Sequence, residues 1–230
     1  MKKRPKLCNA ISEQAAIAGW AYYCFELLFL PGLLLSIAGR LNISQAAVNF
    51  FYYLLNFFFT LSIFRQYLSR SLERAGQHMA RFLLAVAGGF ALCWTFSYGM
   101  HILLARYVPQ FVNINDQAIT ALVNEQPVLM LIGTAMLVPV AEECLFRGLI
   151  FSQLYPKSKP FAYAASAAAF CAVHIIGYVG SYSPAALALS FVQYIPTGLV
   201  LGWAYAHCGS IFAPICIHTA INTLAIWNAL

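Results

Sequence analysis

Two adjacent glutamates and an arginine lie in one of the most apolar stretches of this chain. Glu142, Glu143 and Arg147 are the only charged residues between Pro127 and Leu154. Placing a charge in the middle of a membrane helix costs about 2.5–3.5 kcal/mol even on insertion scales that give low values. Charged residues inside membrane segments are therefore rare, and these three are a candidate functional site.

Two further pairs of residues, each four positions apart, follow in apolar segments: Phe170 with His174 and His218 with Asn222. Residues four apart lie on the same face of a helix, so the two members of each pair would point toward the same neighbouring helix. A carboxylate, two histidines and an amide are groups that can activate water and polarise a carbonyl. The pattern therefore indicates a hydrolytic site inside a membrane.

The composition is that of a membrane protein. Of 230 residues, 62% are hydrophobic and 9% are charged, and the mean hydropathy is +0.74. We predict an all-α, polytopic transmembrane helical bundle, since the sequence lacks the alternation of a membrane barrel. Seven apolar segments are long enough to cross the bilayer: 14–38, 47–64, 82–105, 127–154, 161–180, 184–206 and 211–230. The count becomes eight if 127–154 breaks at Pro139 or if the amphipathic stretch 65–81 re-enters the membrane.

The net charge of +6 does not indicate a nucleic-acid partner, because the basic residues alternate between loops. Ten of the 13 fall in segments on one side: Lys2, Lys3, Arg4, Lys6, Arg65, Arg70, Arg74, Arg81, Lys157 and Lys159. The opposite side has Arg40 and Arg106. Cytosolic loops are enriched in Lys and Arg, so we expect a cytosolic N-terminus and basic loops that contact lipid headgroups.

The depth of the polar residues decides whether they can meet. Counted from the expected cytosolic ends, Glu142, His174 and His218 lie roughly 12–21 Å inside at 1.5 Å per residue. The sequence thus predicts one intramembrane polar cavity, reached from the cytosolic half. Glu26 and His101, in the first and third spans, are expected to pack between helices or to line this cavity.

Helix geometry predicts different tasks for the two acids. Glu143 and Arg147 are four residues apart and can form a buried ion pair. Glu142 points about 100° away from Glu143 and is left for chemistry, as a general base. His218 and Asn222 can donate hydrogen bonds to a developing oxyanion.

The three motifs together resemble a known family. Glu142 to Arg147 matches EExxxR, Phe170 to His174 matches FxxxH, and His218 to Asn222 matches HxxxN. In this order they are similar to the CAAX protease and bacteriocin-processing (CPBP) family, which includes type II CAAX prenyl endopeptidases. The resemblance covers about residues 127–225. We therefore divide one structural domain into N-terminal spans with an extracytosolic loop, 1–126, and a catalytic core, 127–230.

The resemblance implies a metal-independent intramembrane glutamate endopeptidase without a cofactor. In that family pattern Glu142 and His174 activate the attacking water, and His218 and Asn222 form the oxyanion site. The implied substrate is a membrane-held peptide or protein. The resemblance also favours a bacterial cell membrane, a link to bacteriocin processing or immunity, and a regulatory membrane-protein partner.

The remaining motif residues are expected to support the site. Glu143 and Arg147 position their neighbours, and Phe170 packs beside His174. Cys144 and Cys171 lie inside motifs, but a buried apolar cysteine without a lowered pKa is inert.

Three alternatives stay open at this stage. Carboxylates and histidines are also zinc ligands, although no HExxH occurs. A non-catalytic scaffold or bacteriocin-immunity protein would keep the same residues without cleavage, and a transporter would use the acids as a proton relay. Sensitivity to chelators separates the metalloprotease, and a Glu142→Ala phenotype separates an enzyme from a scaffold.

Overall fold

A computed structural model of the chain describes residues 11–230, and this range contains helices but no strands. The four basic residues at positions 2, 3, 4 and 6, on which the cytosolic N-terminus partly depends, lie outside it. The elements are α1 (Glu13–Leu28), α2 (Leu30–Leu41), α3 (Gln45–Gln77), α4 (Met79–Tyr107), α5 (Ile114–Glu125), α6 (Pro127–Met130), η1 (Leu131–Leu137), α7 (Val138–Glu143), η2 (Cys144–Phe151), α8 (Ser152–Leu154), α9 (Lys159–Val173), η3 (Ile176–Tyr178), α10 (Pro184–Cys208) and α11 (Phe212–Ala229).

Serine residues start four of these helices. The hydroxyls of Ser12, Ser44, Ser158 and Ser183 accept the N–H of the residue three positions on, at 3.2–3.4 Å. Such caps satisfy donors that the first helical turn leaves free, which matters most next to hydrocarbon. The sequence therefore fixes the beginnings of α1, α3, α9 and α10 locally.

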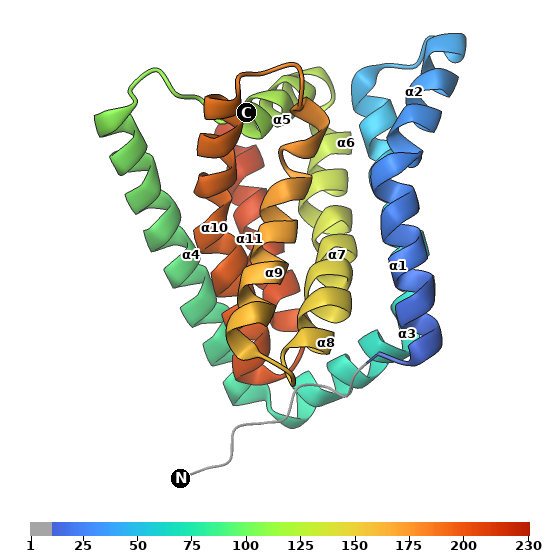
Figure 1. Cartoon of the computed structure of the whole chain (residues 1–230), viewed down its shortest axis with the longest axis vertical. Helices are drawn as coiled ribbons and strands as arrows, with labels where there is room; N and C mark the ends of the chain where they lie inside the picture. The colour runs from blue at the N-terminus through green and yellow to red at the C-terminus, as the bar shows by residue number, and fades with distance from the viewer. Residues whose placement is uncertain (1–10) are drawn as a thin grey trace.

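The long helices run alternately between two ends of the bundle (Figure 1). The lower end carries the α3–α4, α8–α9 and α10–α11 connections, and the upper end carries α2, α5 and η3. The last part of α3 turns across the lower end, so the stretch 65–81 does not re-enter the bundle as a separate span. All six basic loop residues of the predicted cytosolic side that the structure describes belong to this lower end.

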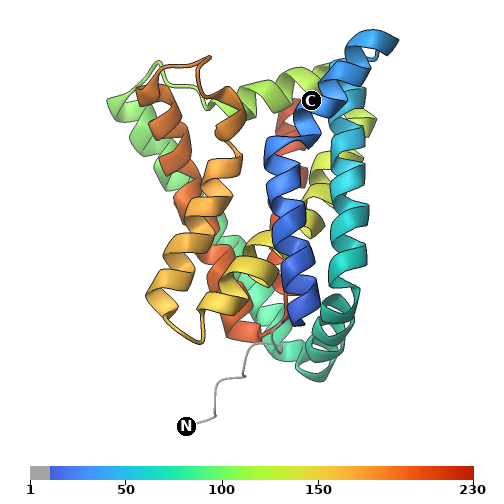
Figure 2. The same ribbon diagram turned by 45° about the vertical axis from the view of Figure 1, so that its right-hand side comes forward.

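The helix from Pro127 to Leu154 lies at the centre. It is one continuous span made of α6, η1, α7, η2 and α8, and Pro139 does not break it. Two π-helical segments flank α7, and every residue of η2 is buried. Figure 2 shows α9 and α10 on one side of this helix and α1 and α3 on the other. The acids of the EExxxR motif therefore lie on the most enclosed element of the fold.

The predicted all-α membrane bundle is confirmed. Four helices are long and apolar enough to cross a bilayer, α3, α4, the Pro127–Leu154 helix and α10, or five if α1 and α2, bent by 47°, form one span. Large apolar side chains project outward, including Leu28 and Leu84, as expected for surfaces that face lipid. The count of seven or eight spans stays a prediction. The segment 161–180 is not one helix, because α9 ends at Val173 and the chain turns through Gly177 and Gly180.

Candidate active site

The acid–arginine pair predicted from the sequence forms the floor of the site. Arg147 Nη1 donates to Glu143 Oε1 at 2.9 Å, and both side chains are completely buried. Arg147 Nη2 also donates to the Gly198 carbonyl on α10 at 2.8 Å, and its guanidinium lies 4.9 Å from the centre of the Phe170 ring on α9. The arginine thus joins three helices around one buried charge.

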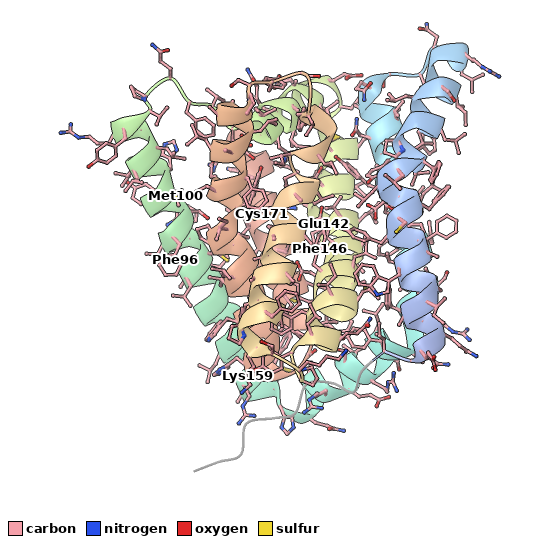
Figure 3. The ribbon with its side chains drawn as sticks, viewed as in Figure 1. Phe96, Met100, Glu142, Phe146, Lys159 and Cys171 are labelled. Atoms are coloured by element: carbon pink, nitrogen blue, oxygen red, sulfur yellow. The ribbon has the colours of Figure 1, made fainter. Side chains whose placement is uncertain are left out.

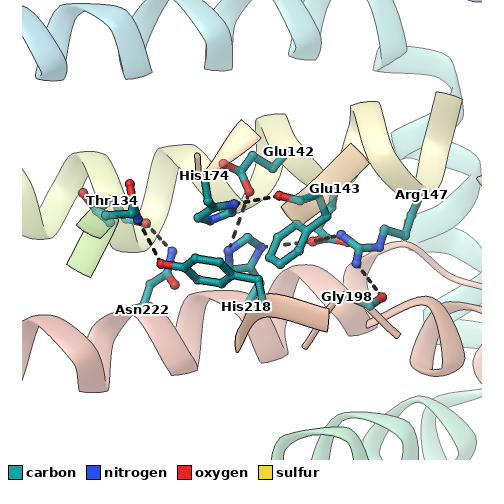
Figure 4. Close-up of polar contacts among 11 residues, drawn as sticks. Thr134, Glu142, Glu143, Arg147, His174, Gly198, His218 and Asn222 are labelled. Carbon is teal, nitrogen blue, oxygen red and sulfur yellow. Dashed lines mark hydrogen bonds and ion pairs between the residues drawn. The ribbon is translucent and has the colours of Figure 1, made fainter. Parts of the chain in front are cut away.

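His218 on α11 lies between the two adjacent glutamates. Its Nδ1 is 3.0 Å from Glu143 Oε1, and its Nε2 is 3.9 Å from Glu142 Oε2. An ionised carboxylate only accepts hydrogen bonds, so Nδ1 carries a proton and donates it to Glu143. Figure 4 shows the resulting row, Arg147, Glu143, His218 and Glu142, in which basic and acidic groups alternate.

His174 is held at the end of α9 by its own helix. Its Nδ1 lies 2.7 Å from the Phe170 carbonyl, which can only accept, so Nδ1 donates and Nε2 has a free lone pair. The imidazole contacts two aromatic rings, both tilted relative to it, with centroids 4.7 Å away for Phe170 and 4.2 Å away for Tyr194. Phe170 is therefore a packing residue here, as its position in the motif predicts.

Tyr194 connects this imidazole to the upper end. Its hydroxyl donates to Asp116 Oδ1 on α5 at 2.6 Å and accepts from Asn115 Nδ2 at 3.2 Å. Burial raises the pKa of Asp116, and the hydrogen bond from Tyr194 opposes that shift. The connection between α4 and α6 contains α5, and it supports His174 through Tyr194.

Asn222, one turn after His218, is anchored to the central helix. Its Nδ2 donates to the backbone carbonyl of Thr134 in η1 at 2.9 Å (Figure 4). A primary amide has two N–H groups, so this bond orients the side chain and leaves one donor for another partner. The π-helical segment η1 thus supplies the group that fixes the amide.

All four predicted catalytic side chains, Glu142, His174, His218 and Asn222, line one cavity of about 1020 Å³. The three predicted supporting residues, Glu143, Arg147 and Phe170, lie behind this lining. Within residues 11–230 no hydrogen bond joins Glu142 to His174, and Glu142 Oε2 has no hydrogen-bond partner. The four predicted catalytic side chains therefore reach the cavity, and the three supporting side chains hold them in position.

The cavity extends toward the upper end rather than the lower end. Its lining includes residues of α2, α5 and η3 and the last turn of α11. Figure 3 shows Glu142 near mid-height, well above Lys159 at the lower end. The expectation of access from the half that carries the basic loops is therefore wrong, because the buried side chains of η2 occupy the space below Glu142.

The wall of the cavity opposite the motifs contains more polar residues than the sequence predicted. Glu26 and His101 were expected either to pack between helices or to line the cavity, and both line it. A polar stripe on α3 was missed: Gln45, Asn49, Tyr52 and Asn56 all line the cavity. Their spacing of four, three and four residues places them on one helix face, and this signal was present in the sequence.

In the described part of the chain, no three side chains among His, Cys, Asp and Glu lie close enough together to hold a metal ion. Cys144 and Cys171 are buried and free, and they do not line the cavity.

Residues 124–224 match the model of a family described as “Type II CAAX prenyl endopeptidase Rce1-like”. This region of the chain is therefore similar to that family. All three motifs fall inside the matched range, so the resemblance to CPBP proteins inferred from them is confirmed.

A curated relative agrees with this result. The chain is 31% identical over 113 residues to a Bacillus subtilis (strain 168) protein named “Putative membrane peptidase YdiL”. The match covers 49% of this chain and 41% of that protein, so the chain matches less than half the length of its relative. No solved structure matches the chain.

Proposed function

We propose that this chain is a membrane-embedded endopeptidase of the CPBP type that uses a glutamate to activate water. The observation that carries the proposal is the convergence of Glu142, His174, His218 and Asn222 from three helices on one cavity. The Rce1-like match over the same residues supports it. The N-terminal region 1–126 would supply the opposite wall, and 127–230 the catalytic core.

Water activation falls to Glu142 and His174. His174, with a free lone pair on Nε2, and Glu142, whose Oε2 makes no hydrogen bond within residues 11–230, both line the cavity, and no hydrogen bond joins the two side chains. A water held by both would be deprotonated by the Glu142 carboxylate as its oxygen attacks a peptide carbonyl. The proton is then returned to the leaving amine by the same group.

Carbonyl polarisation falls to His218 and Asn222. A protonated His218 has Nδ1–H on Glu143 and Nε2–H available to an oxyanion, and Asn222 keeps one N–H. With both glutamates ionised, Arg147 and protonated His218 make the buried row electrically neutral. A neutral row avoids the free-energy cost of an uncompensated buried charge.

The proposed substrate is a peptide or protein held in the membrane by a helix or a lipid. Lipid would surround the bundle, so a substrate held in the bilayer would reach the cavity without leaving the bilayer. The basic lower end, where α1 begins, would face the cytosol and anionic lipids, in line with the cytosolic N-terminus expected from the sequence. A bacterial cell membrane and a regulatory membrane-protein partner belong to the same proposal.

The test compares cells that produce the wild-type protein with cells that produce Glu142→Gln. We expect new termini of membrane peptides only with the wild type, because the variant lacks the base. Glu13→Gln is the matched control, since it removes an exposed carboxylate outside the cavity. Identical termini in all three strains would favour the scaffold or bacteriocin-immunity alternative instead.

A further inference from the structure

A second carboxylate faces the cavity from the wall opposite the motifs. Glu26 on α1 is only 6% exposed, and its Oε1 accepts a hydrogen bond from Tyr52 on α3 at 2.8 Å. Its Oε2 is buried and has no hydrogen-bond partner among residues 11–230. Both residues line the cavity together with Glu142 and His218. Glu26 therefore lines the candidate site and has one carboxylate oxygen without a hydrogen-bond partner among residues 11–230.

Each of the other two acidic residues of the cavity has a hydroxyl or basic neighbour. Asp116 accepts a hydrogen bond from Tyr194, and Glu142 Oε2, which makes no hydrogen bond within residues 11–230, lies 3.9 Å from His218 Nε2. Among the described residues, no lysine or arginine lines the cavity. A buried carboxylate oxygen without a partner is unfavourable unless a ligand supplies a donor or a positive charge. Glu26 has the chemistry to bind a cation, and its own surroundings do not provide one.

The polar stripe on α3 gives a ligand a path toward Glu26. Gln45, Asn49, Tyr52 and Asn56 follow one face of α3 from its start at the upper end toward the middle of the bundle. Amide and hydroxyl groups at this spacing can hydrogen-bond a peptide backbone. The stripe thus leads from the upper end to the level of the motifs, with Glu26 alongside.

We propose that Glu26 and Tyr52 form a binding subsite for a cationic group of the substrate, a lysine or arginine side chain or an amino terminus. This inference rests on the proposed function, because it assumes that the substrate occupies this cavity. Tyr52 orients the Glu26 carboxylate through Oε1, and the carboxylate accepts the N–H of the cation. A substrate with a free carboxylate at this subsite is disfavoured by the same charge.

Binding of lipidated peptides tests the subsite without requiring cleavage. The probes are dodecanoyl-Gly-Gly-lysine amide and its norleucine analogue, which differ in one charged group. The protein is the full chain purified in an uncharged maltoside detergent. A second pair, Gly-Gly-norleucine dodecylamide with a free or an acetylated amino terminus, distinguishes the two sources of positive charge.

The wild type is expected to bind at least one cationic probe about tenfold more tightly than its neutral partner, the value of one charge-assisted hydrogen bond. Glu26→Gln keeps an oxygen that can accept from Tyr52, so the protein should fold and bind the neutral probe with unchanged affinity. Its preference for the cation should fall below about twofold. Glu13→Gln, which removes an exposed charge on the same helix, should keep the full preference.

Equal binding of charged and neutral probes by the wild type would overturn the subsite, as would a preference that survives Glu26→Gln. Failure of the wild type to bind any cationic probe would overturn it as well. A Glu26-dependent preference in a protein that cleaves nothing would contradict the proposed peptidase and retain the subsite. The two proposals can therefore fail separately.

Discussion

Neutralising Glu143 should destabilise the protein far more than neutralising its neighbour Glu142. Glu143 Oε1 accepts from Arg147 at 2.9 Å and from His218 at 3.0 Å, and all three side chains are buried. Glu143→Gln leaves the Arg147 charge without its counter-ion. Glu142→Gln removes a carboxylate whose closest charged partner is 3.9 Å away and whose Oε2 makes no hydrogen bond within the described residues.

The size of the effect follows from the partners that remain. Removing one member of a buried ion pair costs about 3–5 kcal/mol. Arg147 keeps the Gly198 carbonyl at 2.8 Å and the Phe170 ring, so we expect a loss near the lower limit, about 3 kcal/mol. For a chain of this length that loss lowers the Tm by about 6–12 °C. Glu142→Gln should change the Tm by less than about 3 °C.

Thermal unfolding of the purified variants in one detergent measures both changes. The double variant Glu143→Gln/Arg147→Met serves as a control, because removing the stranded cation should recover part of the lost stability. A Glu143→Gln variant as stable as the wild type would refute the buried pair as a stabilising element. An equal loss in Glu142→Gln would refute the different roles assigned to the two glutamates.

Three further outcomes are expected. Asn222→Ala should lower kcat by about 10²–10³ with little change in KM, because an oxyanion donor acts mainly in the transition state, and a rise in KM alone would contradict that role. Exhaustive chelation should leave the cleavage rate unchanged, whereas activity that returns only with added zinc would identify a metalloprotease. Gly198→Ala should lower stability by about 1–2 kcal/mol, since its Cβ would lie 3.1 Å from the Ala167 backbone. Gly39→Ala has no atom within 4 Å of the new Cβ and should not be destabilised.

The site residues could be predicted from the sequence because the signals are local. Four-residue spacing places Arg147 beside Glu143, and the rarity of charges in apolar helices identifies both. The meeting of three helices was predicted from the depth of Glu142, His174 and His218 alone. Depth along a helix is set by a constant rise per residue, so it can be estimated without knowing how the other helices pack.

The direction of the cavity could not be predicted in that way. It depends on how side chains fill the space below Glu142, where every residue of η2 is buried, and above it, where the α3 stripe lines the cavity. The contact of Asp116 with Tyr194 joins positions 78 residues apart and has no local signature. The end of α9 was missed because apolar residues continue to Val179, although Gly180 adopts a positive φ of 90°.

The most direct test of the central claim is the rate at which purified protein in liposomes cleaves a membrane-held peptide. The substrate would be taken from the termini that distinguish wild-type cells from Glu142→Gln cells. We predict measurable cleavage by the wild type and by Glu13→Gln, and none by Glu142→Gln, which still folds and inserts. Cleavage by Glu142→Gln at the wild-type rate would show that this carboxylate is not the base and that the cavity is not the active site.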